Sequence, residues 1–180
     1  GTISWKIDPW PLLLGRLEAT AQHDSMAKPV TLNGTAQALQ IGPGAMQLPS
    51  IALDRLGSPW NAVRPVGSLA VNWQQLRVAR SGFEGKLVLD LRDASSALTT
   101  VRPLGAWRLE VDAKGPAADL RMVPLEGPLR LSGTGNWTAR GGLKFQAEAE
   151  ADEGERLRLQ SLLGLLGRRE GNRTIIRIGA

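Results

Sequence analysis

Apolar and polar residues alternate along most of the chain, and this period of two constrains the fold more than any other feature. In the segment 86–91, Leu87, Leu89 and Leu91 fall on one side of an extended backbone, and charged or smaller residues separate them. The same alternation recurs in residues 2–7, 66–73, 85–91, 106–111, 129–137 and 143–151. We predict a strand in each segment, with one face on a core and the other in water.

Glycine and proline separate these segments. The pairs and triplets Gly42-Pro43-Gly44, Gly115-Pro116, Gly127-Pro128 and Gly141-Gly142 are typical of turns. The 21 glycines and 11 prolines exceed what long helices tolerate, which favours many short strands. We place the prolines at segment ends, where a missing backbone donor costs least.

Two stretches follow a helical spacing instead. Ala94, Ala97, Leu98 and Val101 are spaced as one helical face, and Pro103 ends the run. Leu159, Leu162, Leu163 and Leu166 repeat that spacing, and Gly167 follows as a C-terminal cap. We predict two short helices there, each held by packing its apolar stripe onto a sheet.

These helices belong to an apparent internal repeat. Trp73 and Trp137 are 64 residues apart, and Gly105 and Gly167 are 62 apart. Each copy reads as a strand ending in tryptophan, a turn, a strand, a short apolar helix, a glycine and a strand. We therefore predict one all-β domain over residues 1–180, an antiparallel curved sheet or sandwich built from a duplicated unit and carrying two short helices.

Charge and composition exclude several classes of protein. The net charge of +5 would suit nucleic acid, but the arginines are scattered and interleaved with acidic residues, so we predict a solvated surface and no nucleic-acid partner. There is no cysteine, and no window approaches the roughly 18 apolar residues of a membrane span. The chain starts at Gly1, which predicts that a targeting segment has been removed.

Two small motifs carry catalytic residue types. Ser25 and Lys28 match the serine-x-x-lysine pattern of acyl-enzyme hydrolases, but the other motifs of those enzymes are absent and Pro29 disfavours a helix. His23, the only histidine, lies beside Asp24 without a nucleophile elbow or a cysteine partner. We predict a polar loop and a surface turn, with no catalytic residues.

Charged clusters near the C-terminus have equally plain interpretations. The acidic cluster (Glu148, Glu150, Asp152, Glu153 and Glu155) has the residue types of a calcium or glycosidase site, but it fits the wet face of a half-buried strand better. The arginines at 156, 158, 168, 169, 173 and 177 lack interleaved aromatic residues that would stack bases. We predict no metal and no cofactor, and we assign the six tryptophans chiefly to core packing.

The order of the weak motifs resembles one known family. The matching pieces are residues 1–9 with Leu13-Leu14-Gly15, residues 67–73, residues 104–109 continuing to 127–135, and the ending 159–167 with 174–179. Taken together, they make the chain similar to type II secretion system protein N.

The resemblance implies a function that composition does not. Members of that family are anchored in the inner membrane by a short N-terminal helix, absent from this chain, and the rest lies in the periplasm. The family is an accessory, non-enzymatic part of the secretion apparatus, expected to associate with the inner-membrane protein M and the secretin, protein D. The implied role is to bridge or stabilise these parts by protein–protein contact in protein export. The alternative is a periplasmic carrier of lipid or other hydrophobic cargo with an apolar β groove.

Overall fold

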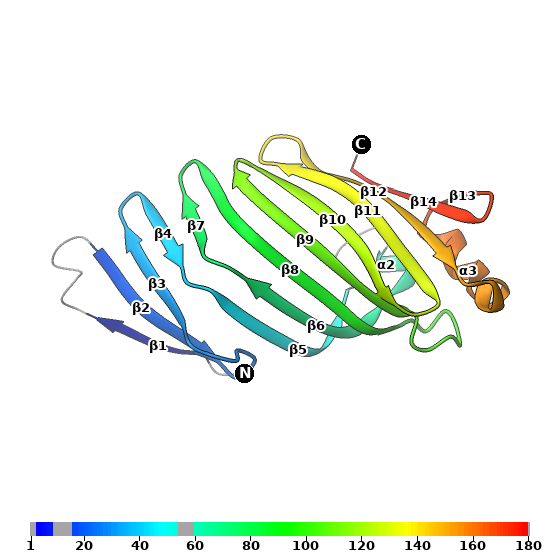
Figure 1. The fold of residues 1–180 in the computed structure, drawn as a ribbon, viewed down its shortest axis with the longest axis horizontal. Coiled ribbons are helices and arrows are strands. Elements are labelled where there is room, and N and C mark those ends of the chain that lie inside the picture. Colours follow the sequence, from blue (N-terminus) through cyan, green and yellow to red (C-terminus); the bar gives the residue numbers. More distant parts are fainter. Residues whose placement is uncertain (1–2, 9–15, 54–59, 180) are drawn as a thin grey trace.

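The structure is a computed structural model that describes residues 3–8, 16–53 and 60–179. Its strands form one open antiparallel sheet, which Figure 1 shows as a long, twisted and curved layer. The order across the sheet is β1-β2-β3-β4-β7-β8-β9-β10-β11-β12-β14-β13, and β5 pairs with β6, which in turn pairs with β8. The predicted all-β antiparallel fold is therefore confirmed, as a single curved sheet and not a sandwich.

The described elements have the following bounds. The first seven strands are β1 (Ile3–Asp8), β2 (Arg16–His23), β3 (Val30–Thr35), β4 (Ala38–Ile41), β5 (Gly44–Ala52), β6 (Val66–Trp73) and β7 (Leu76–Ala79). The others are β8 (Gly82–Ser95), β9 (Gly105–Gly115), β10 (Ala117–Glu126), β11 (Leu129–Thr138), β12 (Gly142–Ala151), β13 (Arg168–Glu170) and β14 (Arg173–Ile178). Helix α2 spans Trp60–Val63, a 3₁₀ turn η2 spans Glu153–Glu155, and α3 spans Arg156–Leu166.

Two opposed breaks bend the sheet in its middle. Strands β4 and β5 follow each other directly and are separated only at Gly42-Pro43. Strands β6 and β7, which pair with β5 and β4, are separated only at residues 74–75. At the first break, the indole of Trp73 lies over Gly44, where an added Cβ would fall 2.4 Å from the ring. Only glycine permits that contact, and the Trp73 Nε1–H donates to the Gly42 carbonyl (2.9 Å), so Trp73, Gly42 and Gly44 together fix the bend.

Most of the large apolar residues of the described strands project to one face, which we call the apolar face. Directly opposed residues share a face of a sheet, and Val71, Leu89 and Leu109 are opposed across β6, β8 and β9. Leu87 lies opposite Trp73 and Val111 in the next row. The alternation predicted for residues 85–91 is thus confirmed, with Leu87 and Leu89 on the apolar face.

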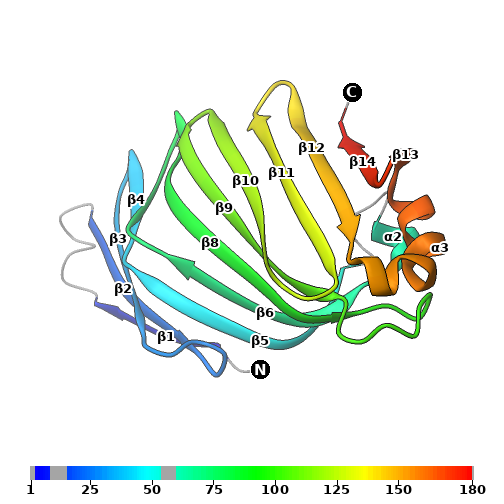
Figure 2. The same ribbon diagram turned by 45° about the vertical axis from the view of Figure 1, so that its right-hand side comes forward.

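The apolar face is covered at one end only. Helix α2, which precedes β6, packs against α3, which follows β12, although several strands separate β6 from β12 in the sheet. This contact requires the sheet to curve toward its apolar face, as Figure 2 shows. We call this the helical end of the sheet and the opposite end, where the hairpins β7–β8, β9–β10 and β11–β12 turn, the turn end.

The core lies beneath these helices. Its most buried large side chains are those of Leu104, Leu129, Leu131, Leu159, Leu162 and Ile176. The Trp107 indole, 6% exposed, completes the core, and its Nε1–H donates to the Leu129 carbonyl (2.9 Å). Among the described tryptophans only Trp107 is fully buried, and Trp137 is 42% exposed, so the assignment of the tryptophans to core packing holds in full for Trp107 alone.

The helix predicted over residues 94–101 is wrong. Ala94 ends up in strand β8, and residues 96–104 form an irregular loop. The Ser96 hydroxyl accepts from the Leu98 N–H, and the Thr99 hydroxyl accepts from the Val101 N–H. Such local side-chain bonds compete with a helix for backbone donors.

The second predicted helix is confirmed as α3, with Gly167 as its C-cap. The glycine is needed because an added Cβ would meet the Ile175 carbonyl oxygen of β14 at 2.1 Å. The repeat is therefore only partial, since its first copy lacks the helix. In addition, β9 pairs with β8, whereas β13 pairs with β14 and not with β12.

Two prolines were misplaced by the sequence-based prediction. Pro49 lies within β5 and Pro124 within β10, not at segment ends. Both stand where the register shifts, between Leu48 and Ile51 and between Pro124 and Glu126. A bulge leaves a residue outside the regular pairing, so proline is tolerated there.

Candidate functional site

The structure brings His23 together with Ser25, not Ser25 with Lys28. The Ser25 Oγ lies 2.6 Å from His23 Nδ1, and the Ser25 backbone N–H donates to the same nitrogen (3.1 Å). Because Nδ1 is an acceptor for the backbone, the hydroxyl is also a donor to it. The three atoms close a two-residue turn, and no described carboxylate is hydrogen-bonded to the ring to orient it as a base.

The turn that holds these residues has a structural role. The Ser25 carbonyl accepts from the Gln47 N–H (2.7 Å), and Met26 forms an isolated bridge with Met46. The segment therefore covers part of the outer edge of β5, which the shorter strand β3 leaves open. We interpret the His23–Ser25 contact as the feature that shapes this cover.

The acidic cluster near the C-terminus is divided among separate ion pairs. Glu148 pairs with Arg173 (3.0 Å) across β12 and β14, and Asp152 pairs with Arg130 (2.6 Å). No group of three metal-ligating side chains occurs within residues 3–8, 16–53 and 60–179. These carboxylates lie on the polar side of the sheet and hold neighbouring strands in register.

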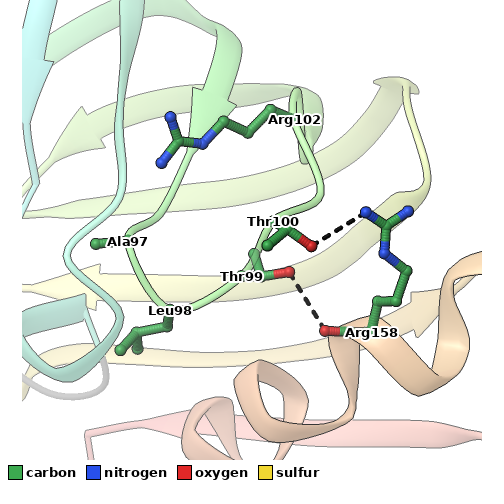
Figure 3. Close-up of a pocket in the computed structure, with 6 residues that line it drawn as sticks. All are labelled: Ala97, Leu98, Thr99, Thr100, Arg102 and Arg158. Carbon is green, nitrogen blue, oxygen red and sulfur yellow. Dashed lines mark hydrogen bonds between the residues drawn. The ribbon is translucent and has the colours of Figure 1, made fainter.

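A shallow hollow lies between the 96–104 loop and α3 (Figure 3). Arg158 is one of two arginines that line it, and its Nη1 donates to both carboxylate oxygens of Glu155 (3.1 and 3.0 Å) and its Nη2 to the Thr100 hydroxyl (3.0 Å). The Thr99 hydroxyl donates to the Arg158 carbonyl (3.3 Å), and the Arg102 side chain points away from Arg158. The contacts of Arg158 thus tie the loop to α3.

The strongest electrostatic contact lies in the middle of the polar face. Asp90 of β8 and Arg108 of β9 are directly opposed and form two hydrogen bonds, Nε to Oδ1 (2.7 Å) and Nη2 to Oδ2 (2.8 Å). The Asp90 side chain is 9% exposed. The hydrogen bonds from Arg108 lower the pKa of the Asp90 carboxyl, and burial opposes this shift.

The Asp90 pair predicts a pH dependence of stability. A lowered folded-state pKa stabilises the protein above the ordinary carboxyl pKa of about 4, and the contribution is lost as pH falls through the lowered value. We expect Asp90→Asn to lower the free energy of unfolding by about 2 kcal/mol at pH 7, since Arg108, 38% exposed, remains partly hydrated. Urea unfolding from pH 7 to pH 2.5 checks this. The difference between variant and wild type should shrink below about pH 4, and a constant difference would contradict the assignment.

The two ends of the sheet differ in how they are protected. At one end, β13 has three residues, Arg168-Arg169-Glu170, all exposed. Short length and charge are the usual protection of an edge strand. At the other end, β1 pairs over six residues with β2, and among the described residues it has no second neighbour. Of these two ends, β1 is therefore the one that is open to another strand.

Within the described part of the chain, no helix is both long enough and apolar enough to cross a membrane. The geometry of the sheet defines a class first: an open antiparallel sheet with a free edge strand is typical of binding and structural proteins.

Similarity to a known protein family identifies the family of this chain. The family model described as "Type II secretion system (T2SS), protein N" matches residues 1–176, so the chain belongs to that family and is a type II secretion system component. This confirms the resemblance inferred from the sequence. No curated protein and no solved structure gives a significant match.

Proposed function

We propose that this chain is a non-enzymatic structural component that bridges or stabilises the inner-membrane and secretin parts of the type II secretion system by protein–protein contact. The observation that carries the proposal is the open edge of β1 in a protein of this family. An extended segment of a partner would add to the sheet there and gain a row of main-chain hydrogen bonds. Residues 1–180 would act as one periplasmic domain, with protein M and secretin protein D as partners.

Strand β1 suits strand addition for two physical reasons. A six-residue strand offers several unpaired N–H and C=O groups, whereas β13 offers three residues with three charged side chains. The described side chains of Ser4 and Lys6 are exposed, so the polar side of the edge is not covered by the rest of the chain. Pairing at β1 would extend the sheet without disturbing its core, which lies at the helical end among β9, β11, β12 and β14.

Photocrosslinking in cells tests the proposal. A photoreactive amino acid at Lys6, on the β1 edge, should capture a secretion component, identified by mass spectrometry after purification of the adduct. The matched control carries the same group at Arg121 of β10, an exposed residue on the polar face in the middle of the sheet. Equal capture at both positions, or capture at Arg121 alone, would rule out β1 as the docking edge.

A further inference from the structure

Part of the apolar face remains outside the core. Val71, Trp73, Leu87, Leu89 and Val111 lie in adjacent rows of β6, β8 and β9, and we call them the open apolar patch. All five are partly exposed and none belongs to the core cluster or packs against it. The patch lies between the helical end, which α2 and α3 cover, and the turn end.

Several apolar side chains at the turn end are exposed. Val78, near the β7–β8 turn, is 39% exposed, and the opposed pair Trp137 and Leu143, near the β11–β12 turn, is 42% and 36% exposed. Between these residues and the patch lies a row with no polar side chain, in which Ala113 (5% exposed) and Ala118 (9% exposed) are buried and Trp137 is exposed. The apolar face thus continues from the patch to the turn end.

The patch offers no polar group to a ligand. Strands β6, β8 and β9 are each paired on both sides, so their backbone donors and acceptors face neighbouring strands. The one polar side-chain atom of the patch, the Trp73 Nε1–H, donates to the Gly42 carbonyl (2.9 Å). A peptide strand lying on this surface would leave its own backbone groups without partners, whereas a hydrocarbon chain has none to satisfy.

Positive charge stands at the turn end. Arg80 lies in the β7–β8 turn and Arg140 in the β11–β12 turn, and both are exposed. No ion pair or hydrogen bond joins either side chain to another described residue. Between them, in the β9–β10 hairpin, Lys114 holds Asp112 (3.3 Å) and Asp119 (3.1 Å) on the polar face, which partly neutralises those carboxylates.

We propose that the open apolar patch binds the acyl chain of an anionic lipid. The chain lies along Trp73, Leu87 and Leu89 with its headgroup toward the turn end, where the positive charges of Arg80 and Arg140, in separate hairpins, favour a negative group. Charge complementarity at this end and the lack of hydrogen-bonding groups on the patch favour a lipid over a protein segment. This binding is independent of strand addition at β1, so either proposal can fail alone.

Tryptophan fluorescence gives a direct test, because bromine quenches indoles that it contacts. The probe is 9,10-dibromostearate, added below its micellar concentration to the purified chain. We expect saturable quenching with one lipid per chain, confirmed by native mass spectrometry. Replacing Trp73 and Trp137 by phenylalanine should reduce the quenching markedly, because Trp107 is buried in the core and Trp60 packs against it. Unsaturable quenching, or none, would overturn the proposal.

A matched pair of variants locates the site. Leu89→Asn places an amide on the patch and should weaken binding by about tenfold, since the amide would be buried against the lipid without a partner. Val88→Asn changes the neighbouring residue of β8, which is also half-buried but lies on the polar face, and should bind as wild type does. Near-ultraviolet circular dichroism checks that both variants are folded. Equal affinities of two folded variants would contradict the assignment.

The charge variant gives a test at exposed positions that do not affect the core. Arg80→Glu combined with Arg140→Glu should weaken binding of dibromostearate several-fold and leave binding of the neutral dibromostearyl alcohol unchanged. Equal effects on both probes, or no effect on either, would exclude a headgroup site at the turn end. Concentration-dependent dimerisation that the lipid does not reverse would show that a second copy covers the patch, and would also overturn the proposal.

Discussion

Trp107→Ala is expected to lower the free energy of unfolding by about 4 kcal/mol, the largest single effect in this chain. The indole is 6% exposed and packs within the core formed by β9, β11, β12 and α3. Its removal would leave a large cavity and would also leave the Leu129 carbonyl without the indole donor at 2.9 Å. The cavity and the lost hydrogen bond act in the same direction.

The matched control is Trp137→Ala, which removes the same side chain where it is 42% exposed. We expect a loss of about 1 kcal/mol there, because much of that surface is already in water. Urea unfolding followed by circular dichroism gives both values. If the two variants lost similar stability, the core would not lie beneath the helices at this end of the sheet.

Leu159→Ala is expected to cost about 3 kcal/mol. Leu159 is fully buried where α3 rests on the sheet, together with Leu162 and Leu166. Helix α3 has no acidic residue in its first turn, no basic residue in its last turn and no side-chain N-cap, so packing of this stripe supplies most of its stability. A smaller side chain there should therefore loosen α3 and the 96–104 loop that Arg158 ties to it.

The control lies two residues away on the same helix. Leu157 is 85% exposed, and Leu157→Ala should change the free energy of unfolding by less than about 0.5 kcal/mol. Both variants exchange leucine for alanine in one helix, so helix propensity cancels in the comparison. Denaturant unfolding measures the difference, and a cost at Leu157 equal to that at Leu159 would mean that α3 packs with its other face.

The strands with clear period-two alternation could be predicted from the sequence because that alternation is a local signal. The six predicted segments correspond to β1, β6, β8, β9, β11 and β12, and β8 and β9 run several residues longer than predicted. Strands β2 to β5, β7, β10, β13 and β14 were not predicted, because their alternation is weaker or their length shorter. The apolar stripe of α3 could be predicted for the same reason, because its buried leucines lie within one short helix. The 94–101 segment failed because its spacing fits a helix, whereas Ser96 and Thr99 bind backbone groups in a turn and Leu98 is 45% exposed.

Features that depend on pairing between distant segments could not be predicted. The Asp90–Arg108 pair exists only in the observed register of β8 and β9, and the short helix α2 is held by its contact with α3. The sequence also did not show which strands stand at the edges. Strand β13, which follows the helix, lies outside β14, so the predicted duplication did not extend to the strand order.

The open apolar patch also depends on contacts between distant segments and could not be predicted. The sequence correctly predicted leucines 87, 89 and 91 on one face, but the separation of Leu91, which packs on the core, from Leu87 and Leu89, which do not, depends on where α2 and α3 lie. Nothing in the sequence distinguished Arg80 and Arg140 from the other scattered arginines. Their relation to the patch appears only once the hairpins are side by side.

Hydrogen exchange resolved to single amides in β1 tests the proposed role most directly. In the free chain, the β1 amides that do not face β2 should exchange rapidly, and in the assembled, detergent-solubilised secretion complex they should become protected by at least tenfold. The amides in the centre of β8 and β9 should exchange alike in both samples. Unchanged exchange throughout β1, with new protection elsewhere in the chain, would contradict docking by strand addition.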